Sequence, residues 1–269
     1  MLAPRIRFFG ERRSFANEGG STGASGALVA PFAEIRTRPY HSGVPLHTLV
    51  DGVWIDSDPV SIVGMPLTAT MTILRLPDGA VALHSPVSMT DERRAEVDRL
   101  GPVTHLIAPS LFHHRWIGEW AGAYPSATLH VPPGLPKKRP DLRAARVIGE
   151  DTDPSLAGTI DFERIDGFRL NEIAVHYRPA RLLIVADLVH NVGRPEGAWA
   201  RFYTKTMGFY DRVALSKMIR STAFSDRAAA RKSIDRILAW QPERLVVGHG
   251  TPVMENVTQT LTAALDWLQ

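Results

Sequence analysis

The chain has 269 residues, of which 44% are hydrophobic and 22% charged, and its formal net charge is only +3. This is the composition of an ordinary globular protein with enough apolar residues for a sizeable core. The absence of cysteine excludes disulfides, thiolate metal sites and a cysteine nucleophile. Basic residues cluster only in short segments, and no stretch approaches the roughly 20 apolar residues of a membrane span, so we expect neither a nucleic-acid nor a membrane partner.

Residues 1–45 are rich in Gly, Ser and Pro and lack periodicity, so we expect a flexible or irregular N-terminal arm. The segment RRSFA is faintly similar to a twin-arginine export signal, but the residues that follow it form a poor hydrophobic region. We therefore expect a cytoplasmic protein. Residues 46–269 show no sharp break in composition and are expected to form a single domain.

Apolar runs and turn residues predict an alternation of strands and helices beyond residue 45. Regular structure is expected to begin over 46–55, and strands are expected on both sides of a PDG turn within 69–87 and at 103–109, 127–131, 160–165, 172–177, 181–188 and 244–250. Helices are expected at 91–100, capped by Thr90, and at 115–124, 204–220, 226–240 and 258–268. Two similar halves of mixed elements favour an α/β fold with two sheets face to face and helices outside, a four-layer sandwich.

Four of the predicted strands are followed by a histidine or an aspartate. They lead to His84, to the pair His113 and His114, to Asp187, and to His249. Open α/β folds bind ligands at the carboxyl ends of their strands, so these residues are expected to gather at one site. A charged Asp187 directly after five apolar residues is costly unless a cation, a helix N-terminus or several hydrogen bonds compensate it.

Each of these residues also has a structural alternative. Asp187 can cap the turn that follows it, and His249 can be a hydrogen-bonded histidine between two glycines. The other histidines in or beside the strand patterns are interpreted as structural rather than as ligands: His84, His105, His130, His176 and His190.

Three segments resemble the metallo-β-lactamase fold superfamily. RLLIVADL is similar to its strand-plus-Asp element, and AWQPERLVVGHGTPV is similar to its late strand with Gly-His-Gly. VTHLIAPSLFHHRWIGEW lies where the superfamily carries Thr-His-x-His-x-Asp-His. The segments MTILRLPDG, LHSPV and PGL..KRPDL are similar to an uncharacterised bacterial branch, a family of unknown function. The resemblance covers residues 46–269 and implies a four-layer αββα sandwich.

The signature is incomplete in this chain. Pro109 and Leu111 stand where its first two histidines belong, His113 takes the place of its Asp, and only His114 is retained. The next metal-binding histidine of the superfamily is expected near residues 168–171, where there is none. In the superfamily these three missing histidines bind one metal ion and the remaining residues bind the other. The resemblance therefore implies one modified metal site, made by His113, His114, Asp187 and His249.

Three imidazoles and one carboxylate suit a single divalent transition metal, zinc first, with iron or manganese as alternatives. An open coordination position would provide a water nucleophile for hydrolysis, whereas a closed tetrahedron would make the site structural. Glu172, at the start of a strand, and His84 are candidates for a catalytic general base or for contacts that support the ligands.

Three functions remain open at this point. The first is a mononuclear metal-dependent hydrolase acting on a small-molecule ester, lactone, amide or phosphoester. The second is a catalytically degenerate member that binds no metal and serves as a binding or interaction protein. The third is a redox-active iron protein, which in the superfamily normally needs two metal ions. The sequence gives neither the substrate nor the oligomeric state, for which a homodimer is one option.

Overall fold

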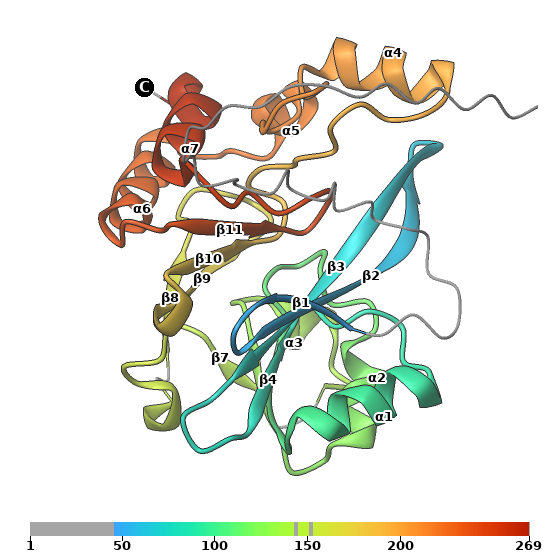
Figure 1. Ribbon diagram of the computed structural model, residues 1–269. Coiled ribbons are helices and arrows are strands. Elements are labelled where there is room, and N and C mark those ends of the chain that lie inside the picture. Colours follow the sequence, from blue (N-terminus) through green and yellow to red (C-terminus); the bar gives the residue numbers. More distant parts are fainter. Residues whose placement is uncertain (1–45, 143–144, 151–152, 269) are drawn as a thin grey trace, which may run out of the picture. The chain divides into compact units, whose positions relative to one another are not determined.

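The computed structural model describes residues 46–142, 145–150 and 153–268. The predicted arm over residues 1–45 lies outside this range, and the single domain over 46–269 remains a prediction. The described residues form two β-sheets with helices on their outer sides (Figure 1). None of the helices in the described ranges has the length and apolar character that a membrane span requires.

The larger sheet has seven strands in the order β1-β2-β3-β4-β5-β6-β7. Their bounds are β1 His47–Val50, β2 Val53–Ile62, β3 Met65–Arg75, β4 Val81–His84, β5 Val103–Ile107, β6 Thr128–Val131 and β7 Arg146–Val147. The first four strands pair antiparallel, and β4 to β7 pair parallel. The predicted PDG turn joins β3 to β4, with the Leu76 N–H bonded to the Ala80 carbonyl at 2.8 Å.

The smaller sheet has four strands in the order β11-β10-β9-β8. Their bounds are β8 Ile160–Arg164, β9 Ile173–Tyr177, β10 Leu182–Val185 and β11 Arg244–Val247. β10 and β11 pair parallel, whereas the other neighbours pair antiparallel. Each sheet therefore contains parallel neighbours whose carboxyl ends lie at the same edge.

Seven α-helices accompany the sheets in the described residues. They are α1 Asp91–Leu100, α2 Ile117–Ala123, α3 Leu135–Lys138, α4 Ala198–Met207, α5 Lys217–Thr222, α6 Arg227–Ala239 and α7 Val257–Leu265. Short 3-10 turns are η1 Pro154–Leu156, η2 Arg178–Ala180 and η3 Asp266–Leu268. The predicted cap of α1 is confirmed, because the Thr90 hydroxyl accepts the Arg93 N–H at 3.1 Å.

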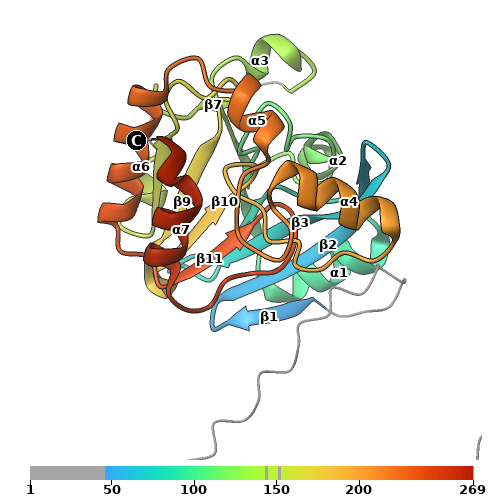
Figure 2. The same cartoon turned by 90° about the horizontal axis from the view of Figure 1, so that it is seen from above.

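Four apolar clusters hold these elements together, and three of them lie on or between the sheets. α1 and α2 pack on the outer face of the seven-stranded sheet, with Trp120 fully buried, and α6 and α7 pack on the outer face of the four-stranded sheet (Figures 1 and 2). A third cluster, including Ile107, Val175 and Ile184, lies between the sheets. This is the predicted αββα arrangement.

Two predicted boundaries are wrong for local reasons. The regular structure expected to begin over 46–55 consists of two strands and extends beyond residue 55, because β2 continues into a hairpin with β3 through Val63 and Gly64, which both have positive φ. The helix expected over 204–220 is two helices, because Gly208 adopts φ 80° and ends α4, while Ser216 caps a separate α5.

Candidate metal centre

Three of the predicted site residues meet at the carboxyl ends of strands from both sheets. His113 follows β5, and Asp187 and His249 follow the parallel neighbours β10 and β11. Nε2 of His113 lies 3.5 Å from Oδ1 of Asp187, and Nε2 of His249 lies 3.4 Å from the same oxygen. The two Nε2 atoms are 3.3 Å apart. These three atoms, one from each side chain, form a nearly equilateral triangle.

The backbone before His113 turns because Ser110 follows β5. The Ser110 hydroxyl accepts the N–H groups of Phe112 and His113 at 3.2 and 3.0 Å. These side-chain hydrogen bonds form a turn, so the backbone does not continue as a strand. The ring of His113 is then fixed by Ser85, whose Oγ lies 3.0 Å from Nδ1. Ser85 itself has φ 50°, a conformation that serine rarely adopts and that commonly marks functional sites.

His249 is held by the other sheet. Its Nδ1 donates to the carbonyl oxygen of Thr68 in β3 at 2.7 Å, so the lone pair of Nε2 faces His113 and Asp187. Gly248 allows this close approach. A Cβ atom at that position would lie 2.5 Å from the Ala186 carbonyl oxygen and 2.7 Å from Cε1 of His113. The close packing of β11 against β10 and against the His113 ring therefore requires glycine before His249.

Glu172 supports Asp187 from behind. Its carboxylate accepts the backbone N–H groups of Ala186 and Asp187 at 2.8 Å each and that of Leu188 at 3.3 Å. Glu172 is completely buried, and it is not one of the residues that line the cavity at the site. It therefore fixes the backbone that carries Asp187 and lies away from the space a substrate could enter.

The ionisable groups of the site shift one another's pKa values. Burial favours neutral Asp187, but the neighbouring His113 and His249 hold the pKa of its carboxyl well below the usual range. Burial and the charge of Asp187 raise the pKa of Glu172 to about 8, against the effect of its three N–H donors. Burial lowers the pKa of His249, but the carboxylate of Asp187 and the Thr68 carbonyl outweigh it and raise that pKa.

Two further histidines lie next to the three. His84 at the end of β4 and His190 are both almost completely buried. Burial, together with the charge of His113 on His84 and of His249 on His190, lowers each pKa to about 3. Neither ring nitrogen of His84 has a hydrogen-bond partner among the described residues, and the same is true of Nδ1 of His190. Unpartnered buried nitrogens are unusual, because each costs the free energy of a lost hydrogen bond.

His114 is not brought into this group. Its Nδ1 and its carbonyl oxygen each lie 3.2 Å from Nη1 of Arg139. Burial, followed by the charges of Lys138 and Arg139, lowers its pKa. Adjacent residues in a turn diverge, so only one of the two histidines faces Asp187. The site has two imidazoles and a carboxylate where the sequence predicted three imidazoles and a carboxylate.

The positions at which the superfamily carries its other three histidines do lie close together in this chain, but they are apolar. The Leu111 N–H donates to the Leu170 carbonyl at 2.9 Å, and the Ile173 N–H donates to the Pro109 carbonyl at 2.8 Å. Backbone hydrogen bonds and aliphatic side chains thus occupy this place. In the described ranges, no group of potential ligands gathers there.

The three residues line a cavity of about 200 Å³. Its other walls are mostly apolar, with Arg115, Ser61 and Ser85 as polar members; the apolar residues are Val60, Ile62, Ala69, Pro86, Phe112 and Trp116. Ser85 and Thr68 were not identified from the sequence. The position of Ser85 directly after the strand end at His84 was a usable signal, whereas nothing in the sequence pointed to the Thr68 carbonyl.

Comparison with models of known protein families identifies one family that matches the chain. The family described as a domain of unknown function (DUF4336) matches residues 50–259. The chain belongs to this family. A search of curated proteins gives no significant match.

Solved structures with the same fold are metallo-β-lactamase fold proteins. The structure is similar to a metallo-β-lactamase from Pontibacter korlensis, with 13% identity, a TM-score of 0.56, and coverage of 83% of this chain and 98% of that one. It is similar to the metallo-β-lactamase FIM-1 from Pseudomonas aeruginosa in its mono-zinc form, with 12% identity, a TM-score of 0.54, and coverage of 83% and 96%.

A flavodiiron protein shares the fold as well. The Flv1 flavodiiron core from Synechocystis sp. PCC6803 has 14% identity, a TM-score of 0.58, and coverage of 83% of this chain and 60% of that one. At these identities the similarities show the fold alone. They confirm the metallo-β-lactamase fold that the sequence motifs predicted.

Proposed function

We propose that this protein is a mononuclear metal-dependent hydrolase of a small ester, lactone, amide or phosphoester, with His113, Asp187 and His249 as the metal ligands. The triangle of their donor atoms carries the proposal. Its sides of 3.3, 3.4 and 3.5 Å match the edge of about 3.3–3.4 Å expected between ligands of a tetrahedral zinc ion with bonds of about 2.0–2.1 Å.

The residues present fit a divalent transition metal. The Nε2 lone pair of His249 is directed by the Thr68 carbonyl, and the ring of His113 is fixed by Ser85. Two imidazoles and one carboxylate form a donor set that zinc accepts in hydrolases and that iron(II) accepts in other enzymes, so zinc is the first choice and iron or manganese are the alternatives. Because His114 stays outside, the set leaves coordination open on the cavity side, as in catalytic rather than structural zinc sites.

When bound, such an ion supplies Lewis-acid activation of a water molecule or of a substrate oxygen. The protein holds and orients it. The Asp187 carboxylate would offset part of the ion's charge, the two imidazoles would complete the donor set, and Glu172 keeps the Asp187 backbone in place. We assign Glu172 this positioning role instead of that of general base, because it does not line the cavity. His84, with its pKa near 3, is assigned to the packing beside His113.

The cavity favours a small substrate with an apolar body. Phe112 and Trp116 provide aromatic walls, and Arg115 is the cationic residue of the lining. A carboxylate or phosphate group on the substrate would find its countercharge at Arg115. We therefore expect small anionic esters, lactones, amides or phosphoesters to be better substrates than cationic ones.

Metal content is the first test. Protein purified without chelator is analysed for transition metals in wild type and in His113→Ala, Asp187→Ala and His114→Ala. The proposal expects the first two variants to lose the equivalent bound at this site, whereas His114→Ala, the neighbouring histidine, retains it. Loss in His114→Ala together with retention in His113→Ala contradicts the ligand set.

Activity is tested on generic substrates. Wild type is screened against nitrophenyl esters, nitrophenyl phosphodiesters, lactones and anilides, before and after chelation and after readdition of zinc, iron(II) or manganese(II). Hydrolysis that disappears on chelation, returns with a metal and is absent in Asp187→Ala supports the proposal. A folded protein that shows no hydrolysis under any of these conditions and no metal at this site favours the second candidate, a binding protein that keeps the fold, for which the apolar positions Pro109 and Leu111 provide the specific support.

A further inference from the structure

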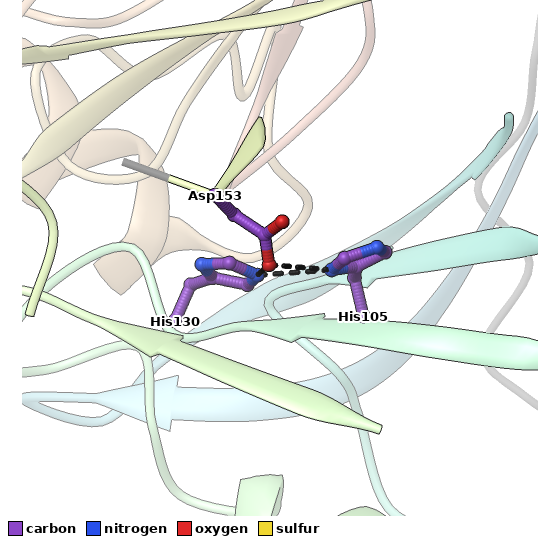
Figure 3. Close-up of side chains that lie close together, drawn as sticks. All are labelled: His105, His130 and Asp153. Carbon is purple, nitrogen blue, oxygen red and sulfur yellow. Dashed lines mark hydrogen bonds and ion pairs between the residues drawn. The ribbon is translucent and has the colours of Figure 1, made fainter. Parts of the chain in front are cut away.

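A second group of potential ligands lies away from the candidate metal centre. His105 in β5 and His130 in β6 sit on neighbouring parallel strands, and Asp153 directly precedes η1 (Figure 3). In the strand register His105 is opposite Thr128, and Ile107 is opposite His130. The two histidines are thus offset by two residues, and their side chains lie on the same face of the sheet.

This face is directed toward the four-stranded sheet. Ile107, two residues after His105, packs in the core between the sheets, and the His130 ring stacks at 6.0 Å on Phe162 of β8. Only 4% of His105 and 2% of His130 is exposed. Two imidazoles are therefore placed between apolar layers, next to a carboxylate whose side chain is 9% exposed, and buried polar groups are costly unless their partners satisfy them.

The donor atoms converge on one point. Nδ1 of His105 and Nε2 of His130 are 3.0 Å apart, and Oδ2 of Asp153 lies 3.9 Å from each of them. The centre of a triangle with these sides is about 2.1 Å from every corner, which agrees with zinc–nitrogen and zinc–oxygen distances of about 2.0–2.2 Å. Figure 3 shows the three side chains pointing toward one another.

The contact between the two rings differs from the contact that each ring makes with Asp153. The two imidazoles can share one proton at 3.0 Å, but 3.9 Å is too long for a hydrogen bond from either ring to Asp153. Arg146 also approaches Oδ2 of Asp153, at 4.0 Å. Its side chain is 37% exposed, so it can neutralise part of the carboxylate charge from the outside while both rings remain on the inside.

Ser155 prepares the group for a cation. Its Oγ lies 2.5 Å from Oδ1 of Asp153 and 3.3 Å from Nε2 of His105. A hydroxyl has one proton, which goes to the carboxylate, so Ser155 accepts from Nε2–H of His105. This tautomer leaves Nδ1 of His105 with its lone pair toward His130 and Asp153. The use of the second ring nitrogen to fix a metal-binding tautomer is typical of histidine ligands.

We propose that His105, His130 and Asp153 form a second metal site that takes a borderline divalent cation such as Zn²⁺. With three protein ligands the site would leave one coordination position for a water molecule, and we assign it a structural role because His105 and His130 are buried between the sheets. It joins β5 and β6 of the larger sheet to the residue that precedes η1, the short turn before β8 of the smaller sheet. It shares no ligand with the centre at Asp187, so a fully loaded chain binds two ions, and each site can be emptied without removing the other.

The test isolates this site on a background in which the first is disabled. In the His113→Ala, Asp187→Ala double variant, stripped with chelator, zinc is titrated in competition with a chromophoric chelator. One equivalent is expected to bind with an affinity high enough to compete. Adding Asp153→Asn, which keeps the acceptor for Ser155 but removes the charge, is expected to weaken binding roughly tenfold or more, as for loss of supporting groups or ligands.

Controls separate loss of binding from loss of folding. His176→Asn is the matched control, because His176 is also a buried strand histidine with an aspartate partner, Asp161, at 3.3 Å, but belongs to neither group. It is expected to leave zinc affinity unchanged. Far-UV circular dichroism of each stripped variant establishes that it is folded, and zinc is expected to raise the thermal midpoint of the background variant but not that of the background with Asp153→Asn.

Cobalt(II) gives a further readout. Visible absorption of the Co²⁺-loaded background variant reports nitrogen and oxygen ligands directly, and the spectrum is expected to be lost in His130→Asn and retained in His176→Asn. Absence of zinc binding by the folded background variant overturns the proposal. So does binding that survives both Asp153→Asn and His130→Asn. Because the first site is absent from this background, either result leaves the proposed function untouched.

Discussion

Nδ1 of His249 donates a hydrogen bond of 2.7 Å to the carbonyl oxygen of Thr68. His249 follows the last strand of the four-stranded sheet, and Thr68 lies in β3 of the seven-stranded sheet. The orientation of one ligand is therefore set by a backbone group of the opposite sheet. The candidate centre exists only when the two sheets are packed together, which couples metal binding to folding.

Glu172 is predicted to be essential for the position of Asp187. Replacing Glu172 by Ala leaves the N–H groups of Ala186, Asp187 and Leu188 without their buried acceptor. We expect a loss of at least about 2 kcal/mol in the free energy of unfolding, from chemical denaturation, because each unsatisfied buried group costs about 1–3 kcal/mol. Glu163→Ala is the control, since Glu163 pairs with Arg236 near the surface. Equal stability of the two variants would contradict the assigned role.

The same carboxyl gives the metal-free protein a characteristic pH dependence. Burial and Asp187 raise the pKa of Glu172 from 4.5 to about 8, so the folded state favours its protonated form. The stability this contributes is fully present below pH 4.5 and is lost as the pH rises toward 8. Chelator-treated wild type should therefore lose stability over this range more steeply than Glu172→Gln. Parallel pH profiles of the two proteins would argue against the raised pKa.

Gly248 should not tolerate even one methyl group. The added Cβ of Gly248→Ala would clash with the Ala186 carbonyl and the His113 ring. We expect destabilisation of about 1–3 kcal/mol, typical of overpacking, together with weaker metal binding as the ring moves. Gly122→Ala is the opposite case, because Gly122 lies in α2 with no atom near the added group, and it should stabilise by about 0.5–1 kcal/mol. Thermal and chemical unfolding of both variants measure the contrast.

Ser85 combines two roles that substitutions can separate. Ser85→Gly removes the hydroxyl from Nδ1 of His113 but suits φ 50°, so metal affinity should fall about 10–100-fold while stability is retained. Ser85→Thr keeps the hydroxyl, but a β-branched residue is strained at positive φ, so stability should fall while affinity is largely kept. Competition titration and unfolding curves test the two effects, and unchanged affinity in Ser85→Gly would show that Ser85 does not orient the ligand.

His84 and His190 should make the metal-free protein sensitive to acid. Their folded pKa values of about 3 lie below the ordinary 6.5, so their contribution is intact above pH 6.5 and is lost as the pH falls toward 3. Each should account for about 2 kcal/mol of the stability lost between pH 7 and pH 5. His84→Leu, which also removes two buried nitrogens that have no partner in the part of the chain that the structure describes, should reduce this loss by that amount. Replacing the exposed His47 by Leu should not change it; a similar reduction there would contradict the assignment.

The fold was largely predictable because its signals are local. Apolar runs, the Thr90 cap and the PDG turn are each set by a few neighbouring residues, and they located most strands and helices. The hairpin at Val63–Gly64 was missed because its local signal is poor: valine rarely adopts positive φ, so its presence does not indicate a turn. The positions of His113, Asp187 and His249 after their strands were also predictable, since parallel strands end at a common edge.

The sequence by itself determined the order of strands and helices, the motifs of the family and the set of residues from which a metal site could be built. Only the tertiary structure decided which of them meet. It separated His113 from His114, placed Glu172 behind Asp187 rather than in the cavity, and brought His105 and His130 together through the register of β5 and β6. The physical reason is that a ligand set depends on side-chain directions and strand register, which are fixed by packing between segments far apart in the chain.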